Sequence, residues 1–162
     1  MKTNLKYNYK VVSFLELNKK IINCSDKKIG FTNGCFDILH KGHYSLFKFC
    51  KKHCDILIVA TNSNISIKEL KGKKRPYNNL KTRLINLSSI KDIDYIIYFH
   101  ELNPLNLIKK IQPSLLFKGS DYKIKDVIGR EFVESYGGKT ILVPYIIGGS
   151  TSDILKKKHI YE

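Results

Sequence analysis

The chain has 162 residues, of which 43% are hydrophobic and 27% charged, and its 29 Lys and Arg against 14 Asp and Glu give a formal charge of +15. This length suits one core, so we expect a single domain over residues 1–162 with a polar leader at 1–12. No apolar run approaches the ~20 residues that span a bilayer, which excludes a membrane segment. The basic residues are scattered rather than gathered on one aromatic-rich helix, which argues against a nucleic-acid partner.

The four cysteines lie in a chain without a charged-then-apolar export segment, which indicates a reducing, cytoplasmic compartment. Cys50, His53 and Cys54 are spaced poorly for zinc, and no second ligand cluster accompanies them. We therefore expect these cysteines to be free and Cys50 to face the core.

Apolar, β-branched runs alternate with helical patterns along the chain. A helix is predicted at 14–22, where Ser13 and Glu16 form a capping box. Further helices are predicted from 40 to about 53, just after 62, at 80–90, at 104–111, around 127–136, and from Thr151 onward. Strands are predicted at 28–32, 55–61, 95–99, 114–117 and 139–143. This alternation predicts an α/β fold, a Rossmann-like, doubly wound, five-stranded parallel sheet with helices on both faces and ligands at the carboxyl ends of the strands.

The segment from Phe31 to His43 carries the most chemical information. An apolar strand ends in a turn where Gly34 lets backbone approach a ligand, and a helix then begins. His40 and His43, three positions apart, would place both imidazoles on one side of that helix start. Unpaired backbone N–H groups and the positive end of the helix dipole favour anions there, so the segment predicts a polyphosphate site.

The motif Gly34-Cys35-Phe36-Asp37 followed by His40-Lys41-Gly42-His43 resembles the G-[TC]-F-D-x-x-H-x-G-H signature of the nucleotidyltransferase superfamily. Further matches resemble the adenylyltransferase domain of the enzymes that make ADP-heptose from D-glycero-β-D-manno-heptose 1-phosphate. They are Lys71-Gly72, Arg75-Pro76, Arg83, residues 117–122 and residues 149–154. The resemblance covers residues 14 to 157 and implies that a substrate phosphate oxygen attacks the α-phosphorus of a nucleoside triphosphate without a covalent enzyme intermediate.

The resemblance also implies roles for particular residues. Catalytic roles fall to His40, His43 and Lys71, and contacts to the nucleotide fall to Asn33, Gly34, Cys35, Phe36, Gly42, Lys118, Gly119, Asp121, Ser150 and Thr151. Thr32, Asp37 and Arg75 would contact the second substrate, with bracing as the alternative role of Asp37. Mg²⁺ would arrive with ATP, and Asp121 is the one protein group that could also touch it. The implied partners are ATP and a phosphorylated sugar or polyol, in a homodimer.

The chain departs from the family pattern at three positions. Asn64 stands where an aspartate is common, Ile147 where an acidic residue is common, and Ser152 replaces a threonine. A glycerol-3-phosphate cytidylyltransferase that uses CTP is the alternative enzyme, but Tyr145 replaces the arginine of its R-T-E-G-I-S-T-T element. A nucleotide-binding regulatory protein without turnover is the alternative from another class.

Overall fold

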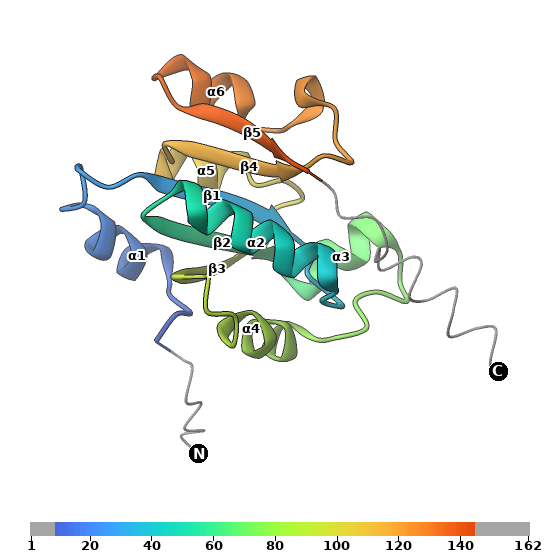
Figure 1. Ribbon diagram of the computed structural model, residues 1–162. Coiled ribbons are helices and arrows are strands. Elements are labelled where there is room, and N and C mark those ends of the chain that lie inside the picture. Colours follow the sequence, from blue (N-terminus) through green and yellow to red (C-terminus); the bar gives the residue numbers. More distant parts are fainter. Residues whose placement is uncertain (1–8, 145–162) are drawn as a thin grey trace.

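The computed structural model describes residues 9–144, which form one five-stranded, fully parallel sheet (Figure 1). The strand order is β3-β2-β1-β4-β5. The strands are β1 (Ile29–Gly34), β2 (Ile56–Asn62), β3 (Tyr95–Phe99), β4 (Leu115–Gly119) and β5 (Lys139–Val143). The chain runs outward from β1 to β3 and then crosses to β4 on the other side of β1. The order of the strands therefore reverses at the carboxyl ends of β1 and β4, where a doubly wound sheet binds its ligands.

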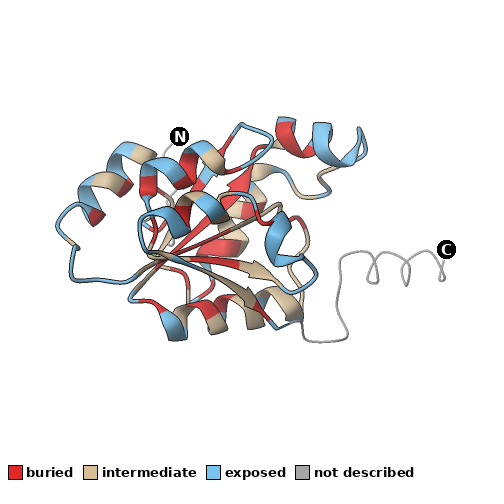
Figure 2. Ribbon diagram, turned by 90° about the horizontal axis from the view of Figure 1, so that it is seen from above, coloured by how far each residue is buried: buried red, intermediate tan, exposed pale blue. Residues whose placement is uncertain are grey.

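Helices cover both faces of the sheet. They are α1 (Phe14–Ile21), α2 (Lys41–His53), α3 (Asn64–Lys71), α4 (Leu80–Ser88), α5 (Leu105–Ile111) and α6 (Arg130–Ser135), with a short 3₁₀ turn η1 (Ile124–Asp126). One core cluster joins the sheet to α1, α5 and α6, and a second joins it to α2 and α4. Figure 2 shows that the residues between the helices and the sheet are buried and that the outer faces of the helices are exposed. The predicted α/β, doubly wound fold is confirmed.

The central strands are buried on both faces. Ile58 and Ala60 of β2 pack into the first cluster, and the alternating residues Leu57 and Val59 pack into the second. Such a strand reads as a continuous apolar run because neither face meets water. This explains why β2 could be recognised from the sequence.

Three strands extend past their predicted carboxyl ends, β2 by one residue to Asn62 and two others by two residues each. β1 continues to Gly34, which pairs in register with Thr61, and β4 continues to Gly119, which pairs with Val143. The added residues are polar or glycine, so no apolar pattern marks them, and their strand geometry comes from the neighbouring strand. Conversely, α4 ends at Ser88, before the predicted end at 90. The helix predicted from Thr151 lies outside the described residues.

The described residues before α1 contact the edge of the sheet. Val11 forms a parallel bridge with Ile96 of β3, and Val12 is buried. Lys10 is also buried, and its Nζ donates to the Ile90 carbonyl oxygen at 2.7 Å. The end of the expected polar leader therefore packs against β3. The capping box of Ser13 and Glu16 is present at the start of α1, as predicted.

Candidate active site

A cleft of about 700 Å³ opens at the carboxyl ends of the strands. This volume is in the range of small-molecule sites. Every predicted site residue within the described chain lines it: Thr32, Asn33, Gly34, Cys35, Phe36, Asp37, His40, Gly42, His43, Lys71, Arg75, Lys118, Gly119 and Asp121. Ser150 and Thr151 lie outside the described residues. The fold thus brings together motifs that are up to 89 positions apart between Thr32 and Asp121.

The two histidine rings lie close together, tilted against each other, at the start of α2. His40 is the N-cap residue, and His43 occupies the third helical position. Their ring centroids are 3.8 Å apart, and the His40 backbone N–H donates to His43 Nδ1 at 3.4 Å. Burial, with smaller effects of His40 and Lys71, lowers the pKa of His43 to about 3. His43 is therefore neutral near pH 7 in this state, and a bound polyanion would favour its protonated form.

The turn at residues 35–40 between β1 and α2, which we call the phosphate turn after its predicted role, takes its shape from Phe36. Phe36 has a positive φ of 45°, and its ring lies 5.3 Å from the His43 ring and 5.2 Å from that of Phe47. A Cβ on Gly34 would lie 3.0 Å from the Phe36 ring, so glycine fits this position best. The aromatic packing thus holds the turn and the histidine pair as one unit.

Lys118 supplies a half-buried amine from the end of β4. Its Nζ lies 3.2 Å from both the backbone oxygen and Oδ1 of Asn33, and 4.7 Å from the centre of the Tyr122 ring. Burial lowers the pKa of Lys118 to about 8, although Asp121 opposes this shift. A Cβ on Gly119 would lie 2.5 Å from Asp121 Oδ1, so glycine gives this carboxylate its room. The end of β4 therefore places a cation and a carboxylate side by side in the cleft.

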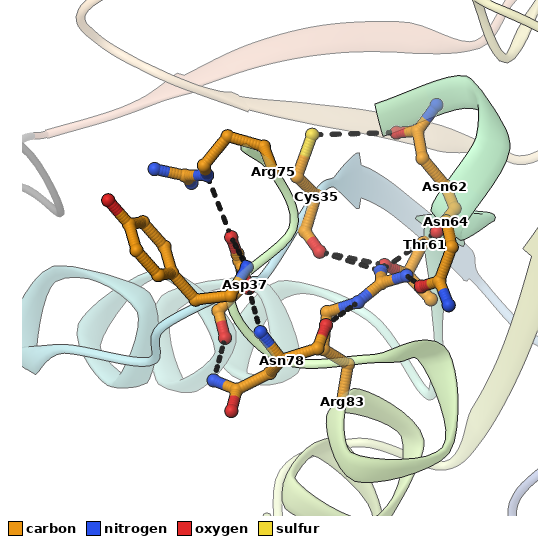
Figure 3. A network of polar contacts seen from close by, with 9 residues as sticks. Cys35, Asp37, Thr61, Asn62, Asn64, Arg75, Asn78 and Arg83 are labelled. Carbon is orange, nitrogen blue, oxygen red and sulfur yellow. Dashed lines mark hydrogen bonds and ion pairs between the residues drawn. The ribbon is translucent and has the colours of Figure 1, made fainter. Parts of the chain in front are cut away.

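Asp37 braces the loop at residues 72–79. Its two carboxylate oxygens accept from the backbone N–H groups of Tyr77 at 2.9 Å and Asn78 at 2.8 Å (Figure 3). Arg75 Nε also lies 2.9 Å from Asp37 Oδ2, close but not aligned as a hydrogen bond, so charge attraction dominates this contact. With its oxygens engaged inside the protein, Asp37 fits the bracing role better than the expected substrate contact.

Arg83 is a match to the family pattern for which the sequence motifs indicated no role. It is fully buried in α4, and its guanidinium reaches three separate segments (Figure 3). The acceptors are the backbone oxygens of Cys35, Asn62 and Asn78, at 2.9, 2.8 and 3.1 Å, together with Thr61 Oγ1 at 2.8 Å and Asn64 Oδ1 at 3.0 Å. The sequence does carry one indication of this role. Arg83 lies on the same face of its helix as Leu80, Leu84 and Leu87, and an arginine on an apolar, core-facing side needs hydrogen-bond acceptors inside the protein.

A parallel sheet in this order, with a histidine pair and lysines around a cleft at its switch point, defines an α/β nucleotide-binding domain. The chain belongs to the cytidylyltransferase-like family of nucleotidyltransferases, whose model matches residues 31–157. It is also 45% identical over 131 residues to the bifunctional protein HldE of Geobacter sulfurreducens, an alignment that covers 81% of this chain. The chain spans only 27% of the length of that relative.

Two solved structures resemble the chain. The lipopolysaccharide core biosynthesis protein of Thermoplasma volcanium is 26% identical with a TM-score of 0.62, over 76% of this chain and 99% of that one. The pantoate-β-alanine ligase of Francisella tularensis is 20% identical with a TM-score of 0.63, over 93% of this chain and 77% of that one. The second likeness concerns the fold alone.

The described part of the chain has neither a cluster of metal-ligating side chains nor a membrane-spanning helix. No group of three or more His, Cys, Asp or Glu lies close enough there to hold a metal ion. All four cysteines are free, as expected. None of the helices at residues 9–144 is long and apolar enough to cross a membrane.

Proposed function

We propose that the chain transfers AMP from ATP to a sugar 1-phosphate, most specifically D-glycero-β-D-manno-heptose 1-phosphate, with release of pyrophosphate and ADP-heptose. The observation that carries the proposal is the cleft itself, which collects His40, His43, Lys71, Arg75 and Lys118 around one volume. The similarity to HldE and to a lipopolysaccharide core biosynthesis protein supports the sugar. The expected roles of the individual residues are part of this proposal.

The chemistry requires two anions to be held in line while negative charge grows on the transferred and leaving oxygens. The imidazoles of His40 and His43 and the backbone of Cys35 and Phe36 would contact the triphosphate. Binding of the triphosphate would protonate His43, because the anion opposes the burial that keeps this ring neutral. The protein provides position and charge rather than a nucleophile.

The lysines enter the cleft from two sides. Lys71 is the exposed last residue of α3, next to the loop braced by Asp37, and would reach the reacting phosphates. Lys118 is half-buried near the end of β4 and would lose its hydrogen bonds to Asn33 or share them with a phosphate oxygen. Ser150 and Thr151 stay predicted nucleotide contacts.

A divalent metal is typical of nucleotidyltransferases, and we propose Mg²⁺. Since the described residues offer no protein cluster for it, the ion would be held by the triphosphate, with Asp121 in the cleft as the one carboxylate within this proposal. When bound, Mg²⁺ would neutralise phosphate charge. The cytoplasmic compartment, the single domain over residues 1–162 and the homodimer stay predictions.

A substrate panel tests the proposed reaction. ATP and CTP are each combined with heptose 1-phosphate, other sugar 1-phosphates and glycerol 3-phosphate, and pyrophosphate release is measured. We expect release with ATP and heptose 1-phosphate. Turnover only with CTP and glycerol 3-phosphate would replace the proposal with the cytidylyltransferase alternative, and binding without turnover on any pair would favour a regulatory protein.

The substitution His40→Ala tests the histidine role. Because the imidazole would stabilise charge that develops only in the transition state, we expect kcat to fall by about 100- to 1000-fold. The melting temperature should change little. His53→Ala, at an exposed position at the other end of α2, is the matched control and should keep full activity. An active H40A enzyme would contradict the assigned role.

A further inference from the structure

Arg83 carries a charge that the fold buries without a carboxylate in contact. Its side chain is fully buried, and each of the five acceptors that the structure gives it is a neutral oxygen. Burying a charge among neutral groups costs free energy, which an apolar side chain in the same stripe of α4 would avoid. Stability alone therefore does not explain an arginine at this position.

The contact to Cys35 links Arg83 to the phosphate turn. The Cys35 carbonyl oxygen accepts from Arg83 Nη1 at 2.9 Å and from Thr61 Oγ1 at 3.0 Å. Neither donor lines the cleft, whereas Cys35 and Phe36 both do. Two donors from outside the cleft lining thus hold this carbonyl, and Figure 3 shows their contacts.

Holding the carbonyl fixes the N–H of the same peptide group. The peptide between Cys35 and Phe36 is trans, so the Phe36 N–H points opposite to the Cys35 oxygen. Because Arg83 and Thr61 do not line the cleft whereas Cys35 and Phe36 do, an N–H that points away from these two donors is on the cleft side of the turn. No described residue accepts a hydrogen bond from this N–H. The turn also holds Phe36 at a φ of 45°, which few residues adopt unless the surroundings enforce it.

We propose that Arg83 is a positioning residue: with Thr61 it holds the Cys35 carbonyl inward and so aims the Phe36 N–H into the cleft as a donor to phosphate. The ligand class rests on the proposed function. Arg83 also binds the Asn78 carbonyl, and Asn78 donates its N–H to Asp37, so the same guanidinium ties the phosphate turn to the loop next to Lys71. Arg83 itself touches no substrate.

Inorganic tripolyphosphate is the probe, because it contains neither base nor sugar and so tests this proposal independently of the substrate pair. Its affinity is measured by calorimetry for the wild-type chain and for Thr61→Val, Arg83→Lys and Arg83→Met. Thr61→Val keeps the side-chain shape, and both Cys35 O and Arg83 Nη1 keep other partners, so this variant should fold. Thr140→Val is the matched control, since the buried Thr140 hydroxyl in β5 has no hydrogen-bond partner.

We expect T61V to bind tripolyphosphate about fivefold more weakly, as for the loss of one hydrogen bond. R83M should lose about 100-fold, with partial rescue in R83K, while T140V binds like the wild type. Adenosine, which has no phosphate, should bind equally to the wild type and T61V. If the substitution loosened the whole fold, the affinity for adenosine would fall as well. Wild-type affinity for tripolyphosphate in T61V, or equal losses for adenosine and tripolyphosphate, would overturn the proposal. A wild-type chain that binds no tripolyphosphate would overturn it as well.

If the substrate panel fails while these affinities follow the expected order, the proposed reaction is wrong and the positioning role stands. If turnover is present, and T61V and folded R83K match the wild type in kcat and in tripolyphosphate affinity, the proposed reaction stands and the positioning role is wrong. The two outcomes are thus distinguishable.

Discussion

His43 shows how one half-buried side chain links the site to the stability of the fold. Its ring lies close to the His40 ring and edge-on to Phe36, and the loss of contact with water favours the neutral form. Under the proposed function, the packing that would position the ring for a phosphate also makes protonation unfavourable until an anion is bound. Binding of a polyanion and uptake of a proton by His43 would then be linked.

This linkage predicts a pH dependence of stability. The pKa of His43 is lowered from 6.5 to about 3 in the folded chain, so between these values the unfolded chain binds more protons. The free energy of unfolding should rise with pH across this window, by at most about 1.4 kcal/mol per pH unit for one proton, and level off above it. Urea unfolding at several pH values measures this slope.

The substitution His43→Asn should remove this part of the slope, whereas His53→Asn, at an exposed position at the end of α2, should keep it. Equal slopes in the wild type and H43N would show that His43 titrates alike in the folded and unfolded chains.

At the scale of elements, the start of α3 and the buried face of α4 meet through Asn64 and Arg83. Asn64 Oδ1 accepts from Arg83 Nη2 at 3.0 Å, and Asn64 is the first residue of α3. A carboxylate there would both pair with the guanidinium and face the positive end of the helix dipole. The family resemblance places an aspartate at this position.

The substitution Asn64→Asp should therefore raise the free energy of unfolding by about 1 kcal/mol at pH 7, as measured by urea unfolding. The gain should disappear below pH 4, where the carboxylate is protonated. Asn106→Asp, in the first turn of α5 at an exposed position, controls for the dipole effect alone. A gain in N106D as large as that in N64D would refute the contribution of Arg83.

Sequence patterns predicted an element well where its own apolar residues mark its ends. They predicted it poorly where a strand end is defined by pairing with residues that are distant in the sequence. β3 and β5 have the predicted bounds because their apolar residues end where the strands end. The ends of β1 and β4 were missed because Gly34 and Gly119 become strand residues only by pairing with Thr61 and Val143. The motifs of the cleft were recognisable in order, but the contact of Arg83 with Cys35 spans 48 positions and leaves no local pattern.

At the scale of the whole molecule, the central strand β1 couples the two core layers. Gly30 of β1 lies against Cys54, after α2, and against Phe117 of β4. A Cβ there would lie 2.7 Å from Cys54 Sγ and 2.8 Å from the Phe117 ring, which is too close for either. The close approach of α2 to the sheet, and with it the position of the histidine pair, depends on this glycine.

The substitution Gly30→Ala should lower the free energy of unfolding by about 1–3 kcal/mol through overpacking, as measured by urea or thermal unfolding. In a Cys54→Ala background the cost should be smaller, because the nearest clashing atom is gone while the Phe117 contact remains. An identical cost in both backgrounds would contradict the packing account.

The sequence by itself determined the fold class and predicted the phosphate motif. Both features produce patterns in neighbouring residues: a strand buried on both faces is a continuous apolar run, and the motif is a glycine turn followed by a histidine-bearing helix. Only the tertiary structure decided what holds the motif in place. Asp37 braces the loop at residues 72–79, because its carboxylate oxygens accept hydrogen bonds from two backbone N–H groups of that loop. Arg83 supports the turn through its hydrogen bond to the Cys35 carbonyl oxygen. Both assignments depend on contacts between segments that lie 40 or more positions apart, and such contacts exist only once the sheet has formed.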